Sequence, residues 1–176
     1  VQQLMNMHDA SLDEAAYLSV IRSKTAKLFE ASSRLAAVLA DAPPRIEQAC
    51  AEHGQSLGTA FQVIDDVLDY DGDAAEMGKN LGDDLREGKA TLPLILAMRA
   101  ASPAEAAKIR EAIETGSTSE LSDIADIVRR CGALSRARAA AAAQAQRAVD
   151  AARTLPSNPY TDSLLELAAQ LLQRRS

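Results

Sequence analysis

The sequence predicts an all-α protein, and three observations support this fold class. Alanine dominates several long runs, aromatic residues make up only 3% of the chain, and there is no Trp. Apolar residues recur at spacings of three and four, which is the period of one helix face. Capping-box sequences and prolines, among them the pair Pro43-Pro44, mark several helix starts. With 176 residues and 47% hydrophobic content, we expect a single domain over residues 1–176.

Two long helices are predicted in the first part of the chain. Ser11-Leu-Asp-Glu14 has the form of a capping box, and the helix that it opens should last to Asp41. Pro43-Pro44 should begin the next helix, because proline is favoured at the first helical position, and this helix should reach about Tyr70. The apolar stripe of the first helix consists of Leu18, Ile21, Thr25, Leu28, Ser32, Leu35 and Leu39.

Shorter helices are predicted after a segment rich in glycine and charge. Residues 71–90 should form a loop with no more than a short turn. Thr91 should cap an apolar helix, Ser102-Pro-Ala-Glu105 repeats the capping-box pattern, and Asn158-Pro159 should open the last helix. The predicted helices are 92–100, 103–115, 119–131, 133–155 and the segment that follows 159.

Charge and composition restrict the classes of partner. A net charge of −6 and a pI near 5.0 argue against nucleic acid as a partner. Cys50 and Cys131 have no paired spacing, which is typical of buried thiols in a reducing cytosol. His8 and His53 are interpreted as surface or core residues. The sequence has no apolar stretch of membrane-spanning length and no signal peptide, so we expect a cytoplasmic protein without a transmembrane segment.

The tract from Gly58 to Tyr70 is the most informative part of the sequence. On a helix that turns about 100° per residue, Asp65, Asp66 and Asp69 share one face with Gln62 and Gly58. The opposite face is apolar and consists of Phe61, Ile64, Val67 and Leu68. One face should therefore lie in the core, and the other should be a polar working surface.

This carboxylate face predicts a metal site. Like charges four residues apart destabilise a helix, so a cation should offset the repulsion. Mg²⁺ is commonly held by one or two carboxylates together with substrate phosphates. Lys79 and Lys89 follow in the loop and would supply positive charge for those phosphates.

Three other interpretations of this region fit the residues less well. A solvated acidic helix face is disfavoured by the apolar opposite face and the lysine loop. A calcium loop beginning at Asp69 is disfavoured because its glycine comes two places early and its twelfth position is Asn80 rather than Glu. A P-loop is excluded because Ala90 follows Lys89, where Ser or Thr would be needed.

These motifs resemble a known family. Phe61-Gln-x-x-Asp-Asp-x-x-Asp69, the loop with Gly78-Lys79 and Gly88-Lys89, and the segment Lys24-Thr25-Ala26-x-Leu28-Phe29 are similar to the second half of a trans-isoprenyl diphosphate synthase. Within that family, the sequence of residues 1–40 and 58–98 is most similar to that of bacterial octaprenyl diphosphate synthases, which make quinone side chains. The resemblance implies an antiparallel helical bundle of the isoprenoid synthase type, around a central cavity, in a homodimer.

The resemblance also implies roles for individual residues. Asp65, Asp66 and Asp69 would bind Mg²⁺ that bridges to the allylic diphosphate. Lys24, Lys79 and Lys89 would contact that diphosphate, and Thr25 and Gln62 would lie beside the allylic carbons. The implied reaction joins isopentenyl diphosphate to an allylic diphosphate such as farnesyl diphosphate.

The family's first aspartate motif and its isopentenyl diphosphate site belong to an upstream half that these residues do not match. We therefore expect residues 1–176 to be the C-terminal part of such a synthase, with the N-terminal half absent and no activity alone. Two alternatives stay open: a non-catalytic helical subunit that regulates a partner synthase, and a class I terpene synthase. The spacing Asp65-Asp66-x-x-Asp69 together with the lysine loop favours chain elongation. Product length is not determined by these residues.

Overall fold

The computed structural model describes residues 6–71 and 82–174, and this part of the chain is helical without strands. The elements are α2 (Glu14–Ile21), the π-helical turn η1 (Arg22–Ala26), α3 (Lys27–Leu39), α4 (Pro44–Asp71), α5 (Asp83–Arg86), α6 (Leu92–Ala100), α7 (Pro103–Thr115), α8 (Leu121–Arg130), α9 (Ala133–Ala152) and α10 (Pro159–Gln173). The all-α prediction is confirmed.

The described residues divide into two compact units. The first contains residues 6–20, 65–71 and 82–138, and the second contains residues 21–64 and 139–174. Helices α4 and α9 each contribute residues to both units. The single domain over residues 1–176 therefore stays a prediction.

In the first unit, α2 begins later than its sequence pattern predicts. Asp13 is the capping residue, because its Oδ1 accepts a hydrogen bond from the Ala16 N–H at 2.8 Å. Ser11 instead donates from its N–H and its hydroxyl to Asp9 Oδ1, at 2.9 and 2.6 Å. The prediction that Ser11 caps this helix is wrong, because the nearby Asp9 carboxylate engages both of its donors.

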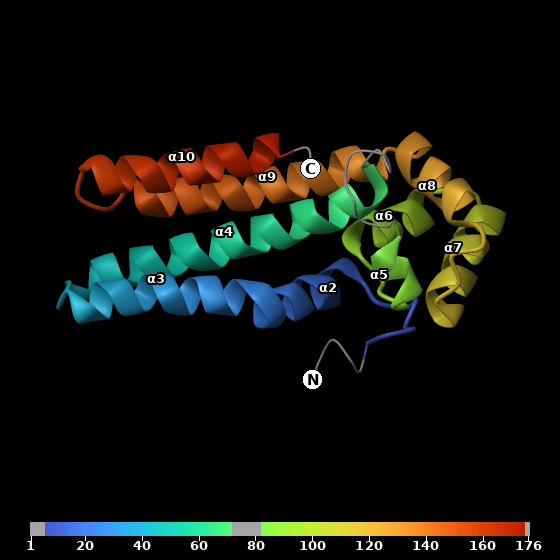
Figure 1. Cartoon of the computed structure of the whole chain (residues 1–176), viewed down its shortest axis with the longest axis horizontal. Helices are drawn as coiled ribbons and strands as arrows, with labels where there is room; N and C mark the ends of the chain where they lie inside the picture. The colour runs from blue at the N-terminus through green and yellow to red at the C-terminus, as the bar shows by residue number, and fades with distance from the viewer. Residues whose placement is uncertain (1–5, 72–81, 175–176) are drawn as a thin grey trace. The chain divides into compact units, whose positions relative to one another are not determined.

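Helices α6, α7 and α8 lie next to one another in the first unit (Figure 1). Helix α6 packs against α7 and α8, and Leu94, Ile109 and Ile124 are fully buried, one from each helix. The capping box at Ser102 is confirmed: the Glu105 N–H donates to Ser102 Oγ, and the Ser102 N–H donates to Glu105 Oε2 at 3.0 Å. Local sequence alone was sufficient to predict this helix start.

The predicted cap at Thr91 is wrong in its chemistry. Thr91 has the extended backbone of a capping residue, but its side chain makes no capping hydrogen bond. The residue is 4% exposed, and within the described part of the chain its Oγ1 has no hydrogen-bond partner. Burial turned this hydroxyl into a core group, so Pro93 in the first turn marks the helix start instead.

In the second unit, the predicted helix from Ser11 to Asp41 is interrupted. Residues 22–26 form the π-helical turn η1, in which the backbone takes up one extra residue, before α3 continues to Leu39. Lys24 is exposed and Thr25 is half-buried on this turn. Such turns are often found at functional sites.

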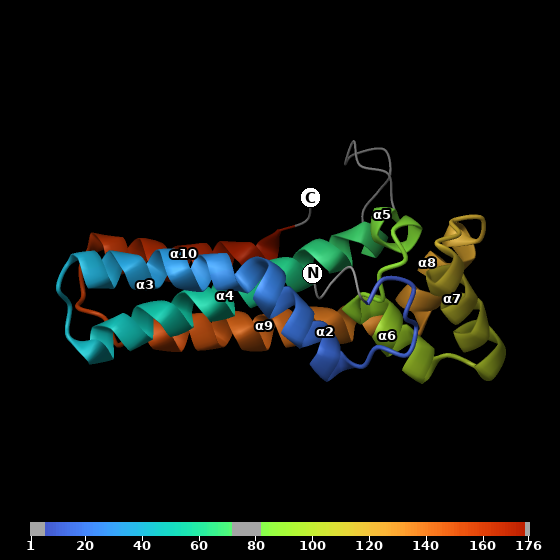
Figure 2. The same cartoon turned by 90° about the horizontal axis from the view of Figure 1, so that it is seen from below.

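Two glycines of α4 let this helix approach α3 closely. A methyl group at Gly58 would lie 2.8 Å from the Ala26 Cα, and one at Gly54 would overlap the Phe29 carbonyl. On another side of α4, His53 Nδ1 donates to the Ala148 carbonyl of α9 at 3.0 Å. Figures 1 and 2 show α3 alongside α4. The two glycines therefore allow the close contact between α3 and α4.

The apolar stripe predicted for the first long helix does not all lie in the core. Ile21 is buried, whereas Leu28, Leu35 and Leu39 of α3 are 72%, 57% and 85% exposed. Helical spacing shows that these residues share a face, but it does not show what covers that face.

Other predictions concern the last helix and the cysteines. Asn158 caps α10, because its Oδ1 accepts from the Tyr160 and Thr161 N–H groups at 2.9 and 3.0 Å. Cys50 and Cys131 are free thiols, half-buried rather than buried. None of the described helices is both long enough and apolar enough to cross a membrane.

Candidate functional site

The predicted carboxylate face lies in the first unit, on the last turns of α4. Asp65 and Asp69 are half-buried, but Asp66 is only 4% exposed. Tyr17 of α2 donates a hydrogen bond from its Oη to Asp66 Oδ2 at 2.6 Å. The expected polar working surface is therefore partly closed, and one of its carboxylates is held by a buried phenol.

Sequence reasoning did not identify Tyr17 as a member of this group, and the structure places it there. Burial raises the pKa of Tyr17 well above 10, and the charges of Asp66, Asp84 and Asp65 raise it further. The hydroxyl therefore keeps its proton and acts as a donor. The three carboxylates that influence this one phenol come from α4 and from the short helix α5, so the fold gathers their charge. A single Tyr 49 residues before Asp66 gives no local signal.

Asp69 at the end of α4 accepts hydrogen bonds from backbone N–H groups at the start of α5. The Asp84 N–H donates to Asp69 Oδ2 at 3.2 Å, and the Gly82 N–H donates to the Asp69 carbonyl at 3.4 Å. Burial, and then the neighbouring charge of Asp84, raise the pKa of Asp69 to about 6. This carboxylate thus loses its proton less readily than an exposed Asp does.

Gly82 makes this arrangement possible. Its φ of 78° lies in the left-handed region that favours glycine, at the position that caps α5. A methyl group there would also lie 2.5 Å from the side chain of Leu121 on α8. The backbone can therefore turn sharply and bring the α5 amides to Asp69.

Lys89, one of the predicted diphosphate ligands, is paired with carboxylates. Its Nζ lies 2.9 Å from Asp84 Oδ1 and 2.6 Å from Glu87 Oε2. Burial opposes the charged form of Lys89, but the hydrogen bonds to Asp84 and Glu87 outweigh it and raise the pKa above its ordinary value. Lys89 is thus a fixed cation beside Asp84. Lys79, the other loop lysine, lies outside the described residues.

The carboxylate oxygens of this group are donors that suit a hard cation of the Mg²⁺ type. In residues 6–71 and 82–174, no three His, Cys, Asp or Glu side chains are arranged to hold a metal ion. Mg²⁺ does not require such a cage, because it keeps waters and takes one or two carboxylates plus phosphate oxygens. Burial is the main cause of the raised pKa of Asp69, and the charge of Asp84 adds to it, so a divalent cation would stabilise the ionised carboxylate. The metal assignment of Asp65, Asp66 and Asp69 stays a prediction.

The second unit brings two other predicted residues together. The Thr25 hydroxyl on η1 donates to Gln62 Oε1 on α4 at 2.7 Å. This bond fixes which end of the Gln62 amide faces Thr25. Lys24, the residue before Thr25, is exposed on the same turn.

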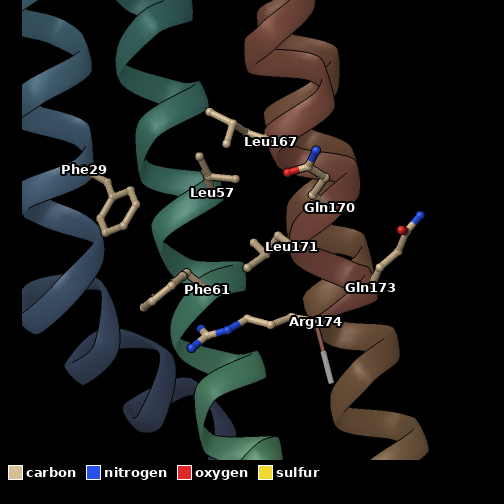
Figure 3. Close-up of a pocket in the computed structure, with 8 residues that line it drawn as sticks. All are labelled: Phe29, Leu57, Phe61, Leu167, Gln170, Leu171, Gln173 and Arg174. Carbon is tan, nitrogen blue, oxygen red and sulfur yellow. The ribbon is translucent and has the colours of Figure 1, made fainter. Parts of the chain in front are cut away.

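An apolar pocket of about 470 Å³ lies in the second unit (Figure 3). It is lined by side chains of α3, α4 and the C-terminal end of the chain, among them Phe29, Leu57, Phe61, Leu167, Leu171 and Arg174. The Phe29 and Phe61 rings lie 5.8 Å apart. The Arg174 guanidinium lies 5.1 Å from the centre of the Phe61 ring, which is a cation–π geometry. This volume is within the range of small-molecule sites, and the lining is suited to an apolar ligand.

Comparison with known sequences gives a consistent result. Residues 1–131 match the family model described as polyprenyl synthetase. The octaprenyl diphosphate synthase of Escherichia coli (strain K12) is 44% identical over 175 residues, which are 99% of this chain and 54% of that protein. The octaprenyl diphosphate synthase of Haemophilus influenzae is 47% identical over 169 residues, 96% of this chain and 51% of that protein. The chain spans about half the length of these relatives.

Solved structures have the same fold over the same share of their length. A polyprenyl synthase from Caulobacter crescentus CB15, complexed with calcium and isoprenyl diphosphate, superposes with a TM-score of 0.92 and 40% identity. A decaprenyl diphosphate synthase from Rhodobacter capsulatus superposes with a TM-score of 0.91 and is 38% identical in sequence. Both comparisons cover 99% of this chain, and they cover 54% and 55% of those chains respectively.

Proposed function

Since this chain belongs to the polyprenyl synthetase family, we propose that it carries part of the active site of a chain-elongating prenyltransferase. The enzyme would condense isopentenyl diphosphate with an allylic diphosphate, such as farnesyl diphosphate. The product would be a long-chain all-trans polyprenyl diphosphate for quinone side chains. We further propose that the protein is a Mg²⁺-dependent, cytoplasmic homodimer.

One observation carries this proposal: carboxylates and a lysine gather in one partly buried group. Asp66 and Asp69 on α4 share their surroundings with Asp84 and Lys89. A cluster of this kind suits a diphosphate that arrives with a divalent cation, because the carboxylates hold the cation and the lysine contacts phosphate oxygens. When bound, Mg²⁺ would supply positive charge that favours departure of the diphosphate. The calcium and isoprenyl diphosphate in the Caulobacter crescentus structure support this ligand class.

Lys24, Lys79 and Lys89 would hold the diphosphate and stabilise its charge as the allylic C–O bond breaks. For that effect, these groups must bind the separated charges more tightly than the intact ester.

The other site residues would act on the hydrocarbon part of the substrate. The Thr25–Gln62 hydrogen bond holds two side-chain dipoles in a fixed orientation, and such dipoles can favour positive charge on the allylic carbons. The apolar pocket beside Phe61 would exclude water from that carbon centre.

The complete protein should be assayed for transfer of labelled isopentenyl diphosphate onto farnesyl diphosphate. We expect long-chain product with Mg²⁺ and none after EDTA. A protein that incorporates no label with Mg²⁺, yet binds a partner prenyl synthase and changes its rate, would support the regulatory alternative. Release of a cyclic hydrocarbon would support the terpene synthase alternative.

A second assay tests whether the site has two sides. Residues 1–176 alone should not elongate the substrate. Activity should appear when a second chain supplies the part of the relatives' length that these residues do not cover. Elongation by residues 1–176 alone would contradict the proposal that an upstream aspartate motif is required.

A further inference from the structure

The contact between Tyr17 and Asp66 is a short hydrogen bond between two buried side chains. Tyr17 is 3% exposed and Asp66 is 4% exposed. The separation of 2.6 Å between Oη and Oδ2 lies in the range of charge-assisted O–H···O⁻ bonds, which are about twice as strong as neutral ones. The two residues come from α2 and α4, so the bond fixes Asp66 from a second helix.

A bond of this kind determines how a carboxylate is oriented. The Asp66 carboxylate is attached through a torsion with a broad energy minimum, so its plane is only weakly fixed by its own backbone. A donor held rigidly by burial selects one orientation. Groups that hold a metal-binding side chain in this way commonly affect metal affinity about as strongly as some ligands do.

We propose that Tyr17 is a positioning residue, whose hydroxyl holds the Asp66 carboxylate in the orientation that binds the divalent cation of the diphosphate substrate. This inference rests on the proposed function, because it assumes that Asp66 is a metal ligand. It assigns a role to α2, which none of the sequence motifs includes.

Tyr70 provides a matched comparison within the same unit. It is 1% exposed and is the residue next to Asp69, so it resembles Tyr17 in burial and in its acidic surroundings. Its hydroxyl, however, hydrogen-bonds no carboxylate of the residues that the structure describes. Replacing either Tyr by Phe removes one buried hydroxyl, but only Tyr17→Phe removes a hydrogen bond to the Asp66 carboxylate.

The experiment measures cation binding in the complete protein without relying on catalysis. Mg²⁺ is titrated in the presence of inorganic pyrophosphate, and thermal stabilisation is recorded for wild type, Tyr17→Phe, Tyr70→Phe, Asp66→Asn and the double variant Tyr17→Phe/Asp66→Asn. We expect Tyr17→Phe to raise the half-saturating Mg²⁺ concentration about tenfold. Tyr70→Phe should leave it unchanged. In the Asp66→Asn background, Tyr17→Phe should change the half-saturating Mg²⁺ concentration little further, because the two residues act as one unit.

The outcomes separate this inference from the proposed function. If Tyr17→Phe lowers the melting temperature but leaves half-saturation at the wild-type value, Tyr17 is only structural and the inference is wrong. If Asp66→Asn itself leaves half-saturation unchanged, the metal assignment fails and with it the premise. If Tyr17→Phe does not fold, fluorotyrosine at position 17 keeps the hydroxyl and makes it a stronger donor. The stronger hydrogen bond draws more charge from the Asp66 carboxylate, so the half-saturating Mg²⁺ concentration should shift from the wild-type value. A value identical to wild type would show that the hydroxyl does not act on cation binding through Asp66 and would overturn the inference.

Discussion

Two groups of carboxylates in the first unit show opposite electrostatic behaviour. Near α4 and α5, burial and then the charge of Asp84 raise the pKa of Asp69 to about 6. On α7, hydrogen bonds to Glu105 from Arg130 and then from Ser102 lower its pKa to about 2. Asp69 therefore lies beside another negative charge. Glu105 instead pairs with a cation, because Arg130 Nη2 lies 2.5 Å from Glu105 Oε1.

The difference separates the proposed binding site from a structural cluster. Glu105 is satisfied within the chain by its helix cap and by Arg130, so nothing further is needed to stabilise its charge. Asp69 is held beside a second carboxylate at a cost that the described residues do not remove. Strongly raised carboxylate pKa values of this kind are typical of functional sites. The following predictions test this distinction.

The largest effect is expected at Asp66. Asp66→Ala in the complete protein should lower turnover by about two to three orders of magnitude, the size seen when one electrostatic group of an active site is lost. It should also leave the Tyr17 hydroxyl buried without its acceptor, at a cost of about 1–3 kcal/mol. Steady-state kinetics and urea unfolding measure the two effects. Glu105→Ala is the control from the structural cluster, and its turnover should match wild type.

Lys89 and Lys108 offer a matched pair of lysines, since each lies between two carboxylates. Lys108 of α7 contacts Glu120, the residue before α8, at 3.3 Å and Asp123 of α8 at 3.0 Å. Lys89→Ala should raise the KM for the allylic diphosphate about tenfold, because a charge-assisted contact to phosphate is lost. Lys108→Ala should leave this KM unchanged. Equal KM values for both variants would show that Lys89 is a structural cation.

The two carboxylate groups should give opposite pH dependence of stability in the absence of metal. The folded pKa of Asp69 is raised from 3.8 to about 6. The contribution of Asp69 to the free energy of unfolding is therefore fully present below about pH 4 and is lost as pH rises through 6. Asp69→Asn should therefore gain stability over wild type across that window. Urea midpoints measured in EDTA from pH 4 to pH 8 test this, and a constant difference would contradict the raised pKa.

Glu105 should show the reverse slope. Its folded pKa is lowered from 4.5 to about 2, so its contribution is present above about pH 4.5 and is lost as pH falls through 2. Glu105→Gln should therefore be less stable than wild type at neutral pH, and the difference should disappear in acid. The same series of urea midpoints, extended to pH 2, provides the measurement.

The smallest effect is expected for the capping box alone. Ser102→Ala removes the acceptor for the Glu105 N–H and should cost about 1 kcal/mol of stability, without changing the Mg²⁺ requirement. Ser135→Ala, at an exposed position of α9, is the control and should be nearly neutral. Melting temperatures of the two variants, with and without Mg²⁺, separate stability from metal binding.

Local sequence was sufficient at two helix starts where neighbours along the chain make the capping interaction. Ser102 and Asn158 cap their helices because their partners lie two or three residues away. The aspartates share a face of α4 because helical geometry alone places residues 65, 66 and 69 together. The same reasoning failed at Ser11 and Thr91, where a competing carboxylate and burial changed the hydrogen bonding.

The sequence by itself thus determined the helices, the aspartate face and, through its motifs, the family. Tertiary structure alone decided which of these groups are buried and what they contact. The Tyr17–Asp66 bond spans 49 residues, and Thr25 meets Gln62 across 37. The exposed leucines of α3 and the raised pKa of Asp69 likewise depend on packing between helices. Helical periodicity fixes the direction of a side chain from its own helix, but burial and charge depend on what the rest of the chain places against it.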